Sequence, residues 1–470
     1  MGKMKFSTLV PEFSHTLLFV AAAVSGIFAS PESEPASNRF KTSFYGAMEA
    51  GQFVKYHYWQ NDLAYAWRQR TILEYHSSYA YSDAFSLELG LGAYMWYYSF
   101  PSEFIRSNRD HNDKNVSPYL PVTKATYLLG DTKDPALAIE FGIFPFKYNS
   151  ESRNLGEYMF RTGAYPNYIQ NDFDFAFARL TGLHLSRVDF GKWKNDVLLN
   201  TETDLQPRFD WTFTYLTEYS PSQFLKVGAG VSFTNFLSVN EDYTTPKAQS
   251  GTSYITNLHT DSLAIGGIKV PITVGDTGYY TFKSTKLMAR ASLNPQALIS
   301  IPRLGPDDLK IYGEIALLGV KNYPRPSPQD TSMFNGFFKD RLQRMPCMFG
   351  INLPTFGLLN LLSVEAEWYG LRGPNSIEYR QQHVAIPLPQ KVKNNPFENG
   401  SYVDADYDKK DNWKWSVYAK KEFVPGLELV GQIARDHVRH SVGYAIQKDW
   451  EEALTKPNQW WWEAKIAFHY

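Results

Sequence analysis

Residues 460–470 read Trp460-Trp461-Trp462-Glu463-Ala464-Lys465-Ile466-Ala467-Phe468-His469-Tyr470, and their polarity alternates. One parity is apolar and holds Trp462, Ala464, Ile466, Phe468 and Tyr470, whereas the other holds Glu463, Lys465 and His469. Because side chains of a β-strand alternate between two faces, the pattern predicts a strand with one apolar and one largely charged face. An ordinary strand of a β-sandwich would give the same alternation.

The aromatic residue at the chain end adds to this pattern. The segment resembles the terminal strand of bacterial outer-membrane β-barrels, which their assembly machinery recognises by a final aromatic and alternating apolar residues. The resemblance implies an integral protein of the cell outer membrane of a Gram-negative bacterium, with outer-membrane lipids and the barrel-assembly machinery as partners. It also implies an assembly signal made of Trp462, Ile466, Phe468 and Tyr470.

The N-terminal residues have the composition of an export signal. Two lysines precede the apolar run LLFVAAAVSGIFA at residues 17–29, which is too short to span a membrane. The cleavage site stays open, because more than one small residue fits it. We expect three parts: a signal peptide over residues 1–29, a periplasmic lead-in over residues 30–40, and a single outer-membrane β-barrel domain over residues 41–470.

Composition agrees with a membrane barrel. Aromatic residues make up 16% of the chain, with 31 Tyr, 32 Phe and 12 Trp, as expected where aromatic girdles mark two membrane interfaces. After the leader, no apolar run approaches the ~18 residues of a spanning helix. The single cysteine, Cys347, excludes an internal disulfide, and we expect it to be a small buried residue within a strand. The net charge of -1 gives no sign of a nucleic-acid partner.

Alternation recurs along the whole chain. Around residue 211, for example, Trp211 and Phe213 lie on one parity and Asp210 and Thr212 on the other. We predict sixteen strands, near residues 41–51, 63–80, 85–96, 117–128, 135–146, 173–188, 194–204, 208–215, 225–233, 279–293, 309–317, 341–353, 361–371, 413–418 and 426–438, plus the C-terminal strand.

The connections between these strands distinguish a barrel from a sandwich. Short and long links largely alternate, and the long ones cover residues 99–116, 147–172, 237–278, 321–340, 372–411 and 439–458. Residues 294–308 and 354–360 are intermediate in length and could carry a helical turn. The alternation predicts a transmembrane antiparallel up-and-down barrel of about 16 strands with both termini in the periplasm. In hydrocarbon the sheet must close, because no backbone group can remain unpaired there.

If the apolar parity faces lipid, the other parity lines a polar lumen. The predicted acidic pore-lining residues are Glu88, Glu140, Glu202, Asp210 and Glu218, and the predicted basic ones are Lys286, Arg290, Lys310 and Arg344. The two sets fall on roughly opposite walls, which would create a transverse field. Glu314, Glu365 and Glu367 do not fit this separation. The alternative is a mixed interior whose charges simply pair.

The third long connection, residues 147–172, mixes charges and aromatics. General porins of sixteen strands fold their third loop into the channel, and this segment resembles that loop in position, length and charge mix. The resemblance implies a constriction formed by Lys147, Glu151, Arg153, Glu157 and Arg161. The alternative is a loop packed over the outer surface.

The sequence signals for metal binding and catalysis are weak. Asp404, Asp406 and Asp408 are spaced like the start of a calcium loop, but Lys409 stands where such loops need glycine. His437 and His440 would point to opposite faces of a strand. We therefore expect no enzyme, no cofactor and no metal site.

Two functions remain from different classes. The first is a porin-like channel for passive diffusion of small hydrophilic solutes through a charged constriction. Such a channel could also assemble as a homotrimer, which would need one sector of the lipid-facing surface to be flat and packed. The second is a surface-binding barrel, for carbohydrate or adhesion, with an occluded lumen, because tyrosines gather in the predicted loops.

Overall fold

The structure is a computed structural model. It describes residues 39–55, 57–58, 61–62, 66–99, 115–160, 178–201, 208–245, 253–279, 281, 283–298, 301–320, 324–326, 334–337, 345–368, 413–435 and 460–470. The expected signal peptide lies outside these residues. The chain divides into a unit of residues 1–41 and a unit of residues 42–470.

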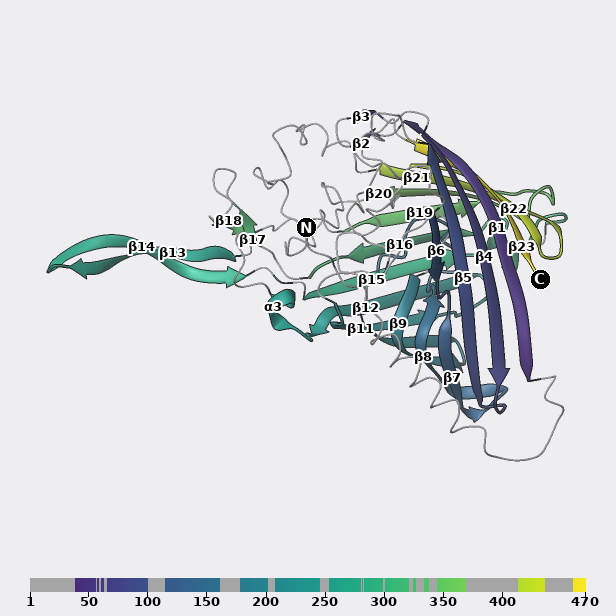
Figure 1. Ribbon diagram of the computed structural model, residues 1–470, viewed down its shortest axis with the longest axis horizontal. Helices are drawn as coiled ribbons and strands as arrows, with labels where there is room; N and C mark the ends of the chain where they lie inside the picture. The colour runs from purple at the N-terminus through teal and green to yellow at the C-terminus, as the bar shows by residue number, and fades with distance from the viewer. Residues whose placement is uncertain are drawn as a thin grey trace, which may run out of the picture. The chain divides into compact units, whose positions relative to one another are not determined.

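One large antiparallel sheet dominates the second unit (Figure 1). Its strands are β1 (Phe40–Lys55), β4 (Ala66–Ala80), β5 (Phe85–Ser99), β6 (Asn115–Tyr119), β7 (Thr123–Asp131), β8 (Asp134–Phe146), β9 (Ala178–Phe190), β10 (Trp193–Thr201), β11 (Trp211–Tyr219), β12 (Leu225–Leu237), β15 (Ser284–Leu293), β16 (Ile311–Leu317), β19 (Cys347–Asn352), β20 (Leu361–Trp368), β21 (Trp413–Val424), β22 (Leu427–Arg435) and β23 (Trp460–His469). Each strand pairs with its neighbours in sequence, as in an up-and-down meander.

The sheet closes on itself. The first strand, β1, pairs with β4 on one side and with the last strand, β23, on the other. Of the 17 strands in the sheet, β6 and β7 both pair with β5 and occupy one position, so the ring has sixteen positions. The predicted fold class and strand number are therefore confirmed, and each predicted strand corresponds to one position.

The closing seam involves the C-terminal strand that resembles an assembly signal. Tyr45 stands opposite His469 and Ala50 opposite Ala464 in an antiparallel register. Beyond it, the backbone N–H of Tyr470 donates to the Phe44 carbonyl at 2.9 Å, and the N–H of Phe44 donates to the Tyr470 carbonyl at 2.7 Å. The end of the chain is thus part of the ring.

Burial is inverted relative to a soluble sheet. In β20, Ser363, Glu365 and Glu367 are buried, whereas Val364 and Ala366 between them are partly exposed. Large apolar side chains of the other parity are open on many strands, namely Met48, Leu73, Leu91, Phe141, Phe349, Ile433 and Ile466. Since a closed ring has one inner and one outer face, the polar parity faces inward and the apolar parity outward. This was the central prediction from the sequence, and it is confirmed.

Aromatic pairs lie on the outer face near both ends of the barrel. Trp193 and Tyr219 flank a short-turn end, with ring centroids 4.5 Å apart. Trp67 and Trp462 lie at the other end of the barrel, where the long connections leave, with ring centroids 6.0 Å apart. Their placement is the one expected of two aromatic girdles.

Some connections differ from the sequence expectation. Residues 237–278 were predicted only as a long link. They contain helix α3 (Glu241–Thr244) and most of a hairpin of β13 (Ser253–Ile265) and β14 (Ile268–Tyr279), which forms a two-stranded sheet of its own. The predicted helical turn after residue 294 is present as η2 (Pro295–Ala297), whereas residues 354–360 form turns without a helix. Two further small sheets pair β2 (His57–Tyr58) with β3 (Asn61–Asp62) and β17 (Pro324–Pro326) with β18 (Phe334–Phe337).

Two further findings concern the burial of Cys347 and the length of the helices. Cys347 is the first residue of β19 and is partly exposed, so the expectation of a buried cysteine was wrong. Among the described residues, no helix has the length and hydrophobicity needed to cross a membrane.

Gly142 gives a first test of the barrel. Its φ of 132° is unfavourable for other residues, and a Cβ there would lie 2.1 Å from the Thr123 carbonyl oxygen of the neighbouring strand. Gly142→Ala is therefore expected to destabilise the folded barrel by about 2 kcal/mol or more, measured as a lower denaturation midpoint in detergent. Gly431→Ala is the matched control, because no atom lies within 4 Å of the Cβ position at Gly431. Equal midpoints for the two variants would contradict this register.

Candidate functional site: a loop held inside the ring

Residues 147–160, here called the inner loop, leave the end of β8 and contact strands far around the ring. Counting β6 and β7 as one position, β8 is the fifth strand, β16 the eleventh and β20 the thirteenth. Position thirteen is diametrically opposite position five in a ring of sixteen. The loop's partners on β16 and β20 are inward-facing side chains in the middle of those strands, so the inner loop crosses the interior of the ring.

Three buried glutamates of the far wall hold this loop through its backbone. The carboxylate of Glu365 accepts the N–H groups of Arg153, Asn154 and Leu155 at 2.6, 2.9 and 2.9 Å. Successive backbone N–H groups form a concave donor surface for an anion, which is the geometry found here. The tip of the inner loop is thus fixed to β20.

Glu314 of β16 holds the next turn of the loop. It accepts the backbone N–H of Glu157 at 3.1 Å and that of Tyr158 at 2.9 Å, together with the Asn149 amide at 3.1 Å. The loop can present these donors because Gly156 and Glu157 have φ values of 80° and 60°, in the left-handed region.

Two tyrosines of the inner loop complete the attachment. The Tyr148 hydroxyl donates to Glu314, and the Tyr158 hydroxyl donates to Glu367 at 2.9 Å. Burial, with the nearby carboxylates adding to it, raises the pKa of both tyrosines well above the usual value. Both hydroxyls therefore stay protonated and act as donors at any physiological pH.

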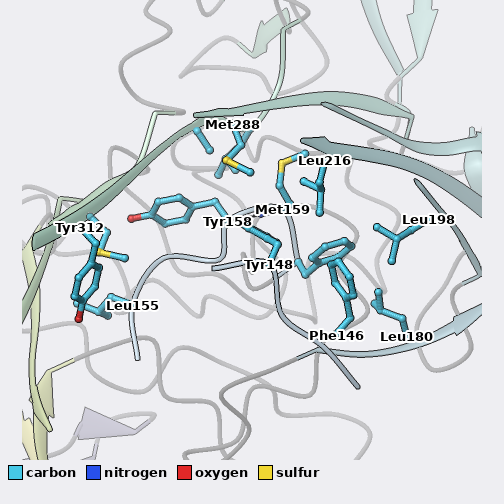
Figure 2. Packing of buried hydrophobic residues seen from close by; sticks show 14 of the residues in the cluster. Phe146, Tyr148, Leu155, Tyr158, Met159, Leu180, Leu198, Leu216, Met288 and Tyr312 are labelled. Atoms are coloured by element: carbon cyan, nitrogen blue, oxygen red, sulfur yellow. Dashed lines mark hydrogen bonds between the residues drawn. The ribbon is translucent and has the colours of Figure 1, made fainter. Parts of the chain in front are cut away.

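An apolar cluster surrounds these polar contacts. Phe146, Tyr148, Leu155, Tyr158, Met159 and Phe160 pack with inward side chains of the wall that include Leu180, Leu198, Leu216, Met288 and Tyr312 (Figure 2). Burial of this much apolar surface stabilises the inner loop within the ring. Part of the interior is consequently filled and apolar, which the sequence interpretation of a polar lumen did not include.

Most of the predicted acidic residues pair with cations of nearby strands. Lys124 lies 2.5 Å from Glu140 and 3.6 Å from Glu88, and the Arg290 guanidinium pairs with Glu218. Arg290 reaches across β12 at Gly228, where a Cβ would be 2.8 Å from its Nε. Its guanidinium also lies 5.9 Å from the ring centre of Tyr148. These contacts follow the alternative in which interior charges pair with one another.

A histidine joins the ion pair of Lys124 and Glu140 to the next strands. The two ring nitrogens of His184 lie 2.8 Å from Glu140 and 2.9 Å from Asp196. Because each nitrogen faces a carboxylate oxygen, the imidazole can satisfy both only as a doubly protonated cation. Lys124, Glu140, His184 and Asp196 thus link β7, β8, β9 and β10 along the inner wall.

The other predicted residues have varied positions. Asp210 is fully buried and accepts hydrogen bonds from the Asn235 amide at 3.2 Å and the Val239 N–H at 2.9 Å, so it holds a connection. Lys286, also fully buried, donates to the Met159 carbonyl at 3.2 Å. Lys310 lies 2.6 Å from Asp307 and 3.6 Å from Glu151. Glu202, Arg344 and Arg161 lie outside the described residues, as do the aspartates at 404–408 and the histidines at 437 and 440.

The remaining predicted loop and terminal-strand residues are placed as follows. Lys147 donates to the Ser152 carbonyl at 2.5 Å, and Glu157 accepts the Asn149 N–H at 2.5 Å. In the terminal strand, Ile466 and Phe468 are exposed on the outer face, Trp462 is partly exposed, and Tyr470 follows the strand. Glu151, Arg153 and Glu157 all lie in the inner loop.

Comparison with known proteins gives likenesses of fold. The chain is similar to OmpF of Salmonella typhi in complex with daunomycin (TM-score 0.46, 9% identity, 93% of this chain and 100% of that one). It is also similar to an anion-selective porin from Comamonas acidovorans (TM-score 0.44, 10% identity, 92% and 100%) and to a triple mutant of the Rhodopseudomonas blastica porin (TM-score 0.41, 8% identity, 92% and 100%). No protein-family model and no curated relative matches the chain. The closed sixteen-stranded ring itself is established by the strand pairings of this chain.

Proposed function

We propose that this chain is an outer-membrane channel through which small hydrophilic solutes diffuse passively. The observation that carries the proposal is the inner loop, which crosses a closed ring and is attached to its far wall by Glu314, Glu365 and Glu367. A loop fixed in this way narrows the path without sealing the ring from outside. The outward apolar face supports a lipid environment, and we propose that both termini are periplasmic.

Solutes would be selected by size and by fixed charge. The inner loop limits the width of the path, and its attachment at both the tip and the next turn keeps that width constant. Charged residues on the wall, such as Lys124 and Arg290, present paired charges that orient polar solutes and disfavour apolar ones. We propose Glu151, Arg153 and Glu157 as the described members of this constriction.

A second function is favoured by one observation. The apolar cluster of the inner loop fills part of the interior, and its members Leu180, Leu198 and Phe160 are at most 1% exposed. A ring filled throughout would conduct nothing and would serve to present its loops to carbohydrate or to another cell. The two functions therefore differ in one property: the lumen is completely blocked in the surface-binding barrel and open in the channel.

Conductance of the purified full-length protein in planar lipid bilayers decides between the two. The channel predicts discrete current steps of uniform size in potassium chloride, since water and ions fill a path beside the inner loop. Protein refolded with the same detergent but lacking the terminal strand serves as the control for detergent leakage. Insertion without steps, together with binding to glycans, would instead support the surface-binding barrel.

A further inference from the structure

We infer that Arg153, with Tyr418 and two lysines of the facing wall, forms an anion-binding site beside the inner loop. This inference rests on the proposed channel and names its preferred solutes: small organic anions that carry a carboxylate or phosphate group.

Arg153 is held in place by its backbone while part of its side chain stays unsatisfied. Its backbone N–H donates to Glu365 at 2.6 Å. Among the described residues, the buried Nε of Arg153 has no hydrogen-bond partner, and the only contact of the guanidinium within hydrogen-bond distance joins Nη1 to the Ser150 carbonyl at 3.4 Å. The residue as a whole is partly exposed. A guanidinium without a carboxylate partner is costly to bury and has donors left for an anion.

Two inward tyrosines interact electrostatically with this guanidinium, and they differ in their own contacts. The Tyr312 hydroxyl already donates to Glu365 at 2.8 Å and lies 2.7 Å from the Ser363 hydroxyl. Tyr418, on β21, stands opposite Ser363 of β20 in the antiparallel register, which places it beside the strand that holds Arg153. It also interacts electrostatically with Arg153, and its hydroxyl has no hydrogen bond within the described ranges. It is therefore a donor that a solute can use.

Two lysines continue the positive surface. Both Lys420 and Lys465 interact electrostatically with Tyr418. The register places Lys420 opposite Val430, and Val430 opposite Lys465, so both lysines lie on one inward row across β21, β22 and β23. Both are partly exposed.

Carboxylates also lie near this surface, and most of them are engaged in contacts of their own. Glu428 forms an ion pair with Lys420, and Glu49 and Glu463 interact with Lys465. Glu49 is itself paired with Arg70 at 2.7 Å. The Arg153 side chain forms no ion pair among the described residues. Glu365, which accepts its backbone N–H, is already engaged by two further backbone N–H groups and by the Tyr312 hydroxyl.

This arrangement fits an anion better than a cation or a neutral solute. The planar fork of a guanidinium binds carboxylate or phosphate through two N–H groups, and the Tyr418 hydroxyl can donate a further hydrogen bond. The lysines add charge that attracts the anion toward the path. The contacts are few, as passage requires binding that is weak enough to release the solute.

The test is the reversal potential of single channels under a tenfold gradient of potassium chloride, with the full-length protein. Wild type is expected to favour chloride over potassium. Arg153→Gln should lower the chloride-to-potassium permeability ratio by about an order of magnitude. One unit charge about 5 Å from the ion path in water changes the permeability of chloride about fourfold, and that of potassium about fourfold in the opposite direction. Arg153→Glu should lower the ratio further, and Arg153→Lys should keep most of it.

Controls separate this inference from the proposed channel. Lys133→Gln removes the same charge from an exposed turn and should leave the ratio unchanged. Should the Arg153 variants fail to fold, Lys420→Gln provides a second reduction of charge at the site. Potassium selectivity in wild type, or a ratio unchanged in Arg153→Gln, would overturn the anion site while leaving the channel intact. The absence of any current in wild type would overturn the channel, and the anion site with it.

Discussion

Glu365→Ala is expected to release the tip of the inner loop and to give larger, fluctuating single-channel currents than wild type. The substitution leaves three backbone N–H groups, those of Arg153, Asn154 and Leu155, without their acceptor. Hydrogen bonds to a charged group contribute about 1.5–3 kcal/mol each, so the attachment of the tip weakens by several such contributions. Conductance in planar bilayers, recorded for many insertions, measures the effect.

Glu88→Ala is the matched control for this prediction. It also removes an inward-facing glutamate, but Glu88 is half-exposed and its ion pair is with Lys124 at 3.6 Å, away from the inner loop. Its currents should resemble those of wild type in their steadiness. If Glu365→Ala gave currents as steady and as small as Glu88→Ala, the loop would not depend on the far wall.

Glu49→Met is expected to destabilise the barrel by about 3–5 kcal/mol, because it removes the carboxylate of a buried ion pair with Arg70. Two guanidinium nitrogens of Arg70 donate to Glu49 at 2.7 and 3.1 Å, and both side chains are at most 2% exposed. Glu49 lies on β1, which closes the ring with β23 and β4. The denaturation midpoint of the folded protein in detergent measures the loss.

The double substitution Glu49→Met with Arg70→Met tests the cause. The double variant avoids a buried guanidinium that has lost this carboxylate, so it should recover much of the lost stability. A double variant as unstable as Glu49→Met alone would show that the shape of the site, and not the loss of this carboxylate beside the guanidinium, is responsible.

Strand positions could be predicted from the sequence because alternation is a local property. In β20, Glu365 and Glu367 alternate with Val364 and Ala366, and the structure buries the charged parity. A single strand cannot show which face is inside, since a sandwich has the same period. The order of short and long connections resolved this point, because an up-and-down membrane barrel has short turns on one side of the membrane and longer loops on the other.

The hairpin of β13 and β14 shows a signal that was present but not used. Gly266 and Gly267 adopt φ values of 58° and 83°, as in a two-residue hairpin turn between alternating segments. The segment was predicted only as a long connection, without structure of its own being assigned. Its length was in fact the room needed for an additional hairpin.

The attachment of the inner loop could not be predicted in its details. Glu314, Glu365 and Glu367 stood out only as acids on the basic side of the predicted wall. Many of their partners are backbone N–H groups, which every residue except proline carries and which leave no pattern in a sequence. Likewise, the contact of His184 with both Glu140 and Asp196 joins three strands, and its geometry depends on the register between them.

The position of the inner loop can be measured most directly by cross-linking two engineered cysteines. A Cβ at Gly156 would lie 2.6 Å from the end of the Met348 side chain, which faces inward from β19, whereas Phe349 beside it is 54% exposed on the outer face. In a Cys347→Ser background, the pair Gly156→Cys and Met348→Cys should be joined efficiently by a short thiol-specific cross-linker in the folded protein, and the pair Gly156→Cys and Phe349→Cys should not. Equal yields from the two pairs, or no product from the first, would contradict a loop held inside the ring.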